Sequence, residues 1–183
     1  MSEARLSRGF PPIAGAGAHI LILGSLPGKK SLEMGQYYAQ PYNAFWRIMG
    51  DLFGAGPALA YPARIERLVA CGIAVWDVLA AGERPGSLDS AIVSSSIVIN
   101  DFVPFFARHR EIALVCCNGQ KAAALYRRHV LPILPRTHAE LPLAVLPSTS
   151  PAHASLSFAA KLARWSAVLG PATEEAARAA RKR

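Results

Sequence analysis

Four short apolar runs, at 19–25, 72–79, 112–119 and 143–148, punctuate the chain. Leucine, isoleucine, valine and alanine fill them continuously, without a polar residue at every second position. Continuous apolar runs of this length, bounded by polar residues, are typical of strands that are buried on both faces of a parallel sheet. The pattern therefore predicts four such strands.

Helices are expected between these strands, beginning near residues 43, 62, 101 and 119. A last helix is expected over 155–170, where Leu156, Leu162 and Val168 recur near helical spacing and Gly170 provides a stop. Alternating strands and helices predict a three-layer α/β/α sandwich around a central, mainly parallel four-stranded sheet. The glycine-rich stretch 14–17 and the proline-rich stretch 132–142 are expected to be loops.

The 183 residues are enough for one domain with a sizeable core, and 52% of them are hydrophobic while 17% are charged. We expect an N-terminal extension over 1–17, the domain over 18–170, and a basic tail or frayed helix over 171–183. No apolar run reaches the ~18 residues of a membrane span. The first ten residues lack the apolar core of a secretory signal, so a cytoplasmic location is predicted.

Charge and cysteines refine this picture. The net charge of +8 favours a polyanionic partner such as nucleic acid, although part of the excess lies in the last twelve residues, where a solvated helix end explains it equally well. Cys71, Cys116 and Cys117 are few and lie in apolar runs, as reduced thiols do. Adjacent residues of a strand point to opposite faces, which argues against a metal shared by Cys116 and Cys117.

Polar or small residues end each predicted strand: Gly24–Ser25, Asp77, Asn118–Gly119 and 147–150. The carboxyl ends of parallel strands share one edge, so these tips should meet in one cleft. The first tip continues as GSLPGKKS, which nearly matches a phosphate-binding P-loop. Only three residues separate its glycines where the P-loop has four, and Pro27 has no N–H to donate. A turn near phosphate or substrate is expected here, rather than a triphosphate site.

The stretch GQYYAQPYNAFW, 35–46, has neither helical nor strand periodicity. Such a loop can place an aromatic face on a base and an amide beside a water or a base edge. Core packing is expected for Phe45 and Trp46, and Asn43 also suits a helix N-cap, a role compatible with a functional one. For Asn118, a left-handed turn before Gly119 is the structural alternative.

These segments, together with GIAVWDVL, CCNGQKA and LPSTSPAH in that order, resemble the uracil-DNA glycosylase superfamily, and within it the hypoxanthine-DNA glycosylase (DNA-deoxyinosine glycosylase) family, over residues 18–170. The resemblance implies a monofunctional DNA glycosylase of base excision repair. Such an enzyme flips a deaminated base, chiefly hypoxanthine, out of double-stranded DNA and hydrolyses its N-glycosidic bond. It further implies no cofactor, no metal, no membrane and no obligatory protein partner, and we expect a monomer.

The resemblance also implies roles for individual residues. Asn43 and Asn118 are the catalytic candidates: Asn43 orients water toward C1′, and Asn118 holds the Watson–Crick edge of the base. Tyr38 is expected to stack on the base, with Ser25 and Leu26 completing the base-binding set; Ser25 is also a candidate for a phosphate contact. The expected DNA contacts are Lys29, Ser148, Thr149, Ser150 and His153. The tip 151–153 would enter the duplex, and His153 would alternatively cap the last helix.

The chain departs from the superfamily pattern at two positions. Leu26 stands where better-known members have a water-activating Asp or Asn, and Leu146 stands where the uracil type has His, which argues against efficient uracil removal. A uracil or mismatch-type glycosylase and a non-catalytic lesion-binding module are the alternatives. A hydrolase using Ser148 or Ser150 with His153 lacks the nucleophile elbow. Asp77 is expected to form a structural ion pair, and loop 87–92 to shape the site or adjoin DNA.

Overall fold

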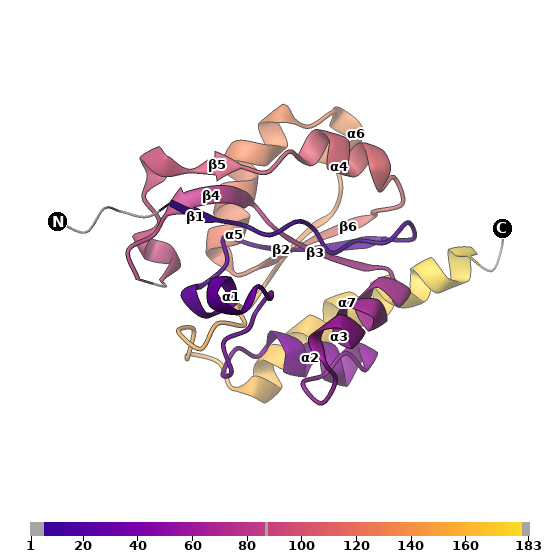
Figure 1. The fold of residues 1–183 in the computed structure, drawn as a ribbon. Helices are drawn as coiled ribbons and strands as arrows, with labels where there is room; N and C mark the ends of the chain where they lie inside the picture. Colours follow the sequence, from indigo (N-terminus) through magenta and orange to yellow (C-terminus); the bar gives the residue numbers. More distant parts are fainter. Residues whose placement is uncertain (1–5, 87, 181–183) are drawn as a thin grey trace.

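The computed structural model describes residues 6–86 and 88–180. Its central sheet has four parallel strands in the order β3–β2–β6–β7. Their bounds are Ile73–Asp77, Ile20–Gly24, Leu114–Asn118 and Leu143–Leu146. Each strand lies inside one of the predicted apolar runs, so the parallel sheet expected from the sequence is confirmed (Figure 1).

Helices cover both faces of this sheet and complete the expected three layers. Figure 1 shows α2, α3 and α7 together on one side of the sheet, with α4 and α6 on the other, and α5 packs against β6 and β7. The helices are α1 Lys29–Met34, α2 Phe45–Phe53, α3 Tyr61–Ala70, α4 Phe102–Arg108, α5 Gln120–Leu125, α6 Arg136–Ala139 and α7 Phe158–Ala180. A π-helical turn, Tyr126–Val130, and a 3-10 turn, Leu131–Ile133, follow α5.

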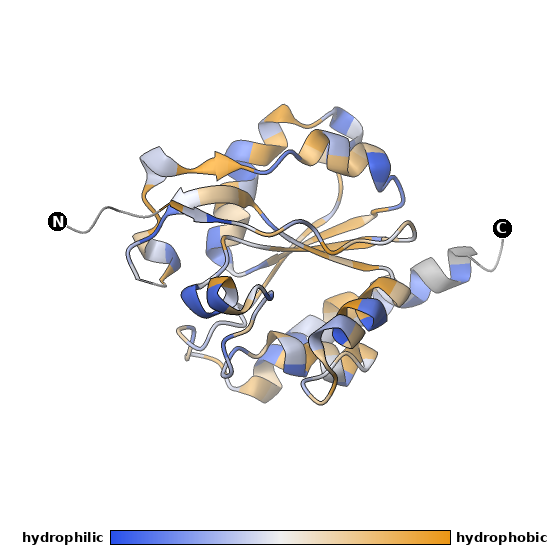
Figure 2. Ribbon diagram, viewed as in Figure 1, coloured by the Kyte–Doolittle hydropathy of each residue, from blue (hydrophilic) through white to orange (hydrophobic). Residues whose placement is uncertain are grey.

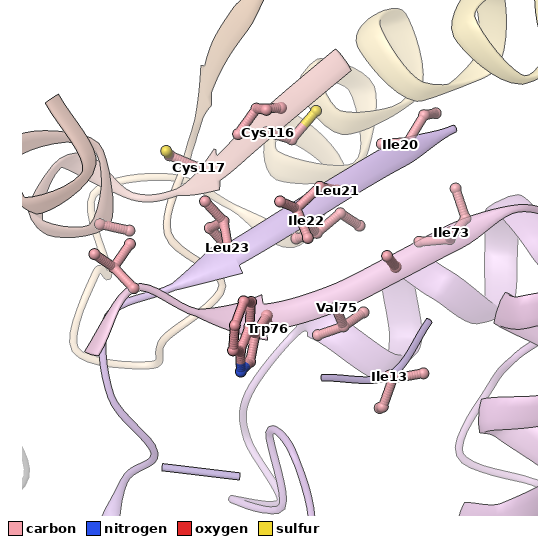
Figure 3. Close-up of a cluster of buried hydrophobic side chains, with 14 of the residues drawn as sticks. Ile13, Ile20, Leu21, Ile22, Leu23, Ile73, Val75, Trp76, Cys116 and Cys117 are labelled. Atoms are coloured by element: carbon pink, nitrogen blue, oxygen red, sulfur yellow. The ribbon is translucent and has the colours of Figure 1, made fainter. Parts of the chain in front are cut away.

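The core lies on and between these layers, because both faces of the sheet are apolar (Figure 2). All five residues of β2 and all five of β3 are buried. Cys116 and Cys117 point away from each other across β6, as their adjacency predicted (Figure 3). Burial raises the pKa of each thiol to about 12, so both are inert packing groups.

A second, antiparallel sheet was not predicted. It comprises β1 Leu6–Arg8, β4 Leu79–Glu83 and β5 Val98–Ile99 in the order β1–β4–β5. The single strand expected over 72–79 therefore divides at Val78, with β3 ending in the main sheet and β4 starting in the small one. Residues 6–8, placed in the N-terminal extension from sequence, pair with β4, and Ile13 bridges to Val75 of β3. The small sheet extends the wall beside the end of β3.

The helix pattern differs from expectation at three places. Gly170 does not end the last helix, because α7 continues through Pro171 to Ala180, and the Thr173 hydroxyl donates to the carbonyls of Leu169 and Gly170 (2.9 and 2.8 Å). The glycine-rich turn GSLPG, residues 24–28, leads into the short helix α1. A helical turn, α6, interrupts the loop expected over 132–142. Within the described residues, no helix is both long and apolar enough to cross a membrane.

Candidate active-site cleft

The strand tips meet in one cleft, as the sequence predicted. Its volume is about 550 Å³, and it lies beyond the carboxyl ends of the parallel strands. Residues of all four tips line it, together with parts of the 35–46 loop and of the loop after β7. The side chains used below are Ser25, Lys29, Tyr38, Asn43, Asp77, Asn118, Thr149 and His153.

A buried arginine holds the glycine-rich turn. The Arg84 guanidinium donates to the carbonyls of Leu26 (3.1 Å) and Pro27, and it pairs with the Asp89 carboxylate at 3.3 Å. The Leu26 side chain is 5% exposed and lies near Leu79 and Ile92 in an apolar cluster around Gly82. Leu26 therefore borders the cleft mainly as backbone that Arg84 fixes.

Asp77 does not form the ion pair that we expected. It ends β3, is 3% exposed, and its Oδ2 is buried without a hydrogen-bond partner among the described residues. Arg84, whose charge acts on Asp77, is already bound to Asp89 and to two carbonyls. Burial and, to a smaller extent, the Asp89 charge raise the pKa of Asp77, Arg84 lowers it, and the net result is a pKa of about 7.

Gly24 allows this carboxyl to approach the end of β2. A Cβ at Gly24 would overlap Asp77 Oδ1 and lie 3.1 Å from the Tyr38 hydroxyl oxygen. Tyr38 has φ of +54°, and it is the one non-glycine residue in the described ranges with a positive φ. Strained backbone of this kind persists where surrounding contacts fix it, and it concentrates at functional sites.

The Tyr38 ring has one face covered by protein. It stacks on Phe45, with centroids 3.9 Å apart and planes at 22°, and Phe45 is fully buried against Trp165 and Trp46. The core roles expected for Phe45 and Trp46 are confirmed. Burial raises the pKa of the Tyr38 hydroxyl, as does the Asp77 charge, while the Asn118 side chain opposes them.

Asn43 lies one residue before Ala44, which is the N-cap of α2, so the N-cap expected at Asn43 is displaced by one residue, although the Asn43 side chain still caps a backbone N–H of the first turn. Its Oδ1 accepts the N–H of Phe45 at 3.0 Å, which fixes the orientation of the amide. An amide oxygen has a second lone pair, and the Asn43 NH₂ group has no hydrogen bond among the described residues. The side chain is partly exposed in the cleft and retains capacity for a water.

Asn118 is bound to Thr149 through both ends of its amide. Its Nδ2 donates to Thr149 Oγ1, and the Thr149 N–H donates to its Oδ1, each at 2.9 Å. Gly119, rather than Asn118, adopts the positive φ (+95°) of the turn, so the turn alternative for Asn118 does not hold. One N–H and one lone pair of the Asn118 amide remain for a ligand.

The loop after β7, residues 147–153, is tied to three other segments: the end of β6, the start of α2, and α7. Asn118 binds Thr149, and the Ala44 N–H donates to the Thr149 carbonyl (2.9 Å), joining this loop to the start of α2. Trp165 Nε1 donates to Pro147 O at 3.0 Å, and Lys161 Nζ donates to Ser150 O at 3.3 Å. Thr149 is 1% exposed and lies at the centre of this hydrogen-bond network. It is therefore poorly placed for the phosphate contact expected of it from the sequence.

The other expected DNA contacts lie at the rim of the cleft. Lys29 is exposed at the start of α1, and Ser148 and Ser150 are partly exposed. His153 is exposed and lies 3.3 Å from the Ser155 hydroxyl; the cap of α7 is Ser157, whose Oγ accepts the Ala160 N–H. The helix-cap alternative for His153 is therefore wrong.

Sequence reasoning missed Arg84, Asp89 and Lys161, which support the site from outside its motifs. Arg84 follows an unpredicted strand, Asp89 was left unassigned in loop 87–92, and Ser87 of that loop lies outside the described residues. Lys161 is 5% exposed on α7, and burial lowers its pKa. A lysine within an otherwise small or apolar helical stretch, FAAKLA at 158–163, was the available signal. The described residues hold no cluster of three His, Cys, Asp or Glu that could bind a metal ion.

Comparison with known proteins identifies relatives of this chain. The model of the uracil DNA glycosylase superfamily matches residues 11–169. A hypoxanthine DNA glycosylase of Methanosarcina acetivorans is 41% identical over 118 residues, which are 64% of this chain and 73% of that protein. One from Methanosarcina barkeri is 38% identical over 120 residues, 63% and 72% of the two chains. The solution NMR structure of a candidate uracil DNA glycosylase from Methanosarcina acetivorans superposes with a TM-score of 0.76 at 36% identity, covering 92% of this chain and 99% of that one.

Proposed function

Because the chain belongs to the uracil DNA glycosylase superfamily and is a DNA glycosylase, we propose that it removes hypoxanthine from duplex DNA, with Asn43 and Asn118 in its active site. The observation that carries this proposal is the meeting of the two asparagines in one cleft of about 550 Å³. They come from segments 75 residues apart in the chain, and Thr149 and Ala44 connect them by hydrogen bonds. The similarity to hypoxanthine DNA glycosylases supports the choice of base.

The chemistry suits two neutral amides. Breaking the bond between C1′ and the purine leaves an oxocarbenium-like sugar, which a weakly activated water can attack. Asn43 holds this water through the free lone pair of Oδ1, while its bond to the Phe45 N–H keeps the amide in place. The free N–H of Asn118 donates to the flipped base, and the Thr149 contacts fix its direction.

DNA binding combines charge at the rim with a structured loop. Lys29, Lys121 and His153 line the cleft, and the chain carries a net charge of +8. The two lysines attract the phosphate backbone without reading sequence, and Ser148 and Ser150 add hydrogen-bond donors. The exposed tip 151–153 enters the duplex where the base leaves, because its neighbours 147–150 are anchored. Extruding a base costs a few kcal/mol and costs least at a weakened pair.

We also propose that the protein acts as a monomer in the cytoplasm, without an obligatory protein partner. All three cysteines are free thiols, as is usual in a reducing compartment.

The proposal is tested with labelled duplexes that carry one hypoxanthine or one uracil. The purified protein is incubated with each duplex in EDTA, and alkali then breaks the strand at abasic sites. Asn43→Ala and Asn43→Ser are compared, because a serine hydroxyl can also accept the Phe45 N–H and so preserve the start of α2. Cleavage at hypoxanthine that falls by at least about 100-fold in both variants supports a catalytic role for the amide.

Other outcomes separate the alternatives. Full activity of Asn43→Ser would show that Asn43 acts only as a cap. Faster excision of uracil than of hypoxanthine would replace the proposed substrate. Binding to the hypoxanthine duplex without cleavage of either duplex would favour the lesion-binding module.

A further inference from the structure

The floor of the cleft contains a carboxyl group that the fold does not use. Asp77 is 3% exposed, its Oδ2 is buried without a hydrogen-bond partner, and the carboxyl forms no ion pair within the described residues. Its backbone carbonyl, in contrast, accepts a hydrogen bond from Asn100 Nδ2 at 2.8 Å. A buried polar group without a partner costs stability, so a retained one indicates a ligand or a reaction that uses it.

The surroundings of Asp77 leave it accessible from the cleft. Asp77 lines the cleft, and glycine at position 24 lets Oδ1 occupy the space that a methyl group there would fill. The Tyr38 hydroxyl lies at the same point, 3.1 Å from the position of that methyl. The unused carboxyl therefore lies beside the aromatic side chain that we expect to contact the flipped base.

The charges around Asp77 favour its neutral form. Asp89 raises the pKa of Asp77 beyond the effect of burial, Arg84 lowers it, and the result is about 7. Tyr37 and Tyr38 face the same carboxyl from the 35–44 loop and remain neutral in this range. His153 and three lysines, Lys29, Lys30 and Lys121, lie at the rim of the cleft, where bound phosphates would neutralise the lysines.

We propose that Asp77 is a catalytic general acid that gives its proton to the departing purine. This inference rests on the proposed function. Neither Asn43 nor Asn118 can transfer a proton, because a neutral amide is not an acid in water. A neutral carboxylic acid in a dry pocket can, and it is matched to chemistry near pH 7.

The step balances without any other reactant. The C1′–N9 bond breaks and its electron pair goes to the purine, while a ring nitrogen or the carbonyl oxygen of the purine takes the proton of Asp77. Water forms the new bond to C1′ and releases a proton, which restores the neutral carboxyl after the base leaves. The products are an abasic site and neutral hypoxanthine.

The test is the pH dependence of single-turnover excision from a hypoxanthine duplex, measured from pH 5.5 to 9 for the wild type, Asp77→Asn and Asp51→Asn. The Asp51→Asn control makes the same change of charge at an exposed position of α2. Wild-type and control rates should fall about tenfold per pH unit above pH 7, because ionised Asp77 cannot give a proton. Asp77→Asn should be about 100-fold slower at pH 6, with a flat profile.

Two further measurements, the melting temperature and the affinity for the duplex, show whether a slower rate of Asp77→Asn reflects the chemical step. Asp77→Asn should melt no lower than the wild type and bind the duplex within about threefold, so that its defect lies in the chemical step. An Asp77→Asn rate within threefold of wild type, or the same falling limb above pH 7, would overturn this inference and leave the proposed function standing. No excision of hypoxanthine by the wild type at any pH would overturn both.

Discussion

The two walls of the cleft differ in whether their polar side chains have hydrogen-bond partners. On the side of β6 and β7, the polar groups are paired: both ends of the Asn118 amide bind Thr149, and Trp165 and Lys161 bind the same loop. On the side of β2 and β3, Asp77 is unpaired and Tyr38 has a strained backbone. The Asn118 amide on the first wall has its hydrogen-bond partners, whereas Asp77 Oδ2 on the second has none within the described residues.

This difference indicates how the two walls contribute. A satisfied network fixes geometry, so the first wall can hold the Asn118 amide and the 147–153 loop in one position. Unpaired groups and strained backbone cost stability and are kept where they take part in binding or chemistry. Removing a polar group should therefore stabilise the second wall and destabilise the first.

The largest effect is expected at Asp77. Its pKa of about 7 in the folded chain lies above the ordinary value of 3.8, so the folded state binds this proton more tightly than the unfolded state does. Stability from this group is greatest below pH 3.8, falls as the pH rises toward 7, and then levels off. Asp77→Asn removes this loss, so its unfolding free energy at pH 8 should exceed that of the wild type by up to ~4 kcal/mol.

Urea denaturation at pH 4 and pH 8 measures this, with Asp51→Asn as the exposed control. The gain at pH 4 should be close to zero, because Asp77 is then protonated in the folded protein. An Asp77→Asn variant that is less stable than the wild type at pH 8 would mean that the carboxylate has a stabilising partner, and the contrast between the walls would fail.

Gly24→Ala should damage the same wall by crowding it. The new methyl group would overlap Asp77 Oδ1, so the carboxyl and the Tyr38 hydroxyl must shift. Overpacking of this kind costs about 1–3 kcal/mol, and we expect hypoxanthine excision to fall by about 100-fold. The control is Gly170→Ala in α7, where the added methyl meets no atom within 4 Å and should stabilise the helix slightly. Equal activity in both variants would contradict the close approach at Gly24.

The parallel sheet could be predicted because its strands are buried on both faces, which leaves a continuous apolar signature along β2, β3, β6 and β7. Strand ends share an edge, so the cleft followed from the polar residue after each strand. The small sheet left no such signature, since β1 and β5 have three and two residues and are half-exposed. Gly170 predicted a helix end, although the helix continues through Pro171, where the Thr173 hydroxyl donates to the carbonyls of Leu169 and Gly170.

Side-chain partners in the site were less predictable, because they depend on tertiary contacts between distant segments. Residue type indicated Asn43 as a cap, a contact two residues away along the chain. The pairing of Asn118 with Thr149 spans 31 residues and depends on the register of β6 and β7. Asp77 was expected to pair with a cation, but Arg84 binds Asp89 and the carbonyls of the glycine-rich turn instead.

Thr149→Val tests the satisfied wall with a substitution of nearly equal shape. It removes the acceptor of Asn118 Nδ2 and leaves a buried amide N–H unpaired, at a cost of about 1–3 kcal/mol. Thr173→Val is the matched control, because its hydroxyl only adds bonds to carbonyls within α7, and we expect less than about 1 kcal/mol there. Thermal unfolding of both variants measures the difference. A Thr149→Val variant that is more stable than the wild type would show that this wall also contains polar groups without stabilising partners.

The smallest effect is expected at Lys161, which anchors the loop from behind. Methionine has a similar length and lacks the ammonium, so Lys161→Met removes the bond to Ser150 O but also the cost of burying a cation. These terms oppose each other, and global stability should change by less than about 1 kcal/mol. The loop itself should loosen, with faster hydrogen exchange at the His153 amide, which is bonded to the same Ser150 carbonyl. Arg164→Met makes the same change of charge at an exposed position one turn further along α7 and should leave this exchange unchanged. Equal exchange in the two variants would mean that Trp165 and Asn118 hold the loop without Lys161, and that the anchoring of this wall depends on its buried contacts alone.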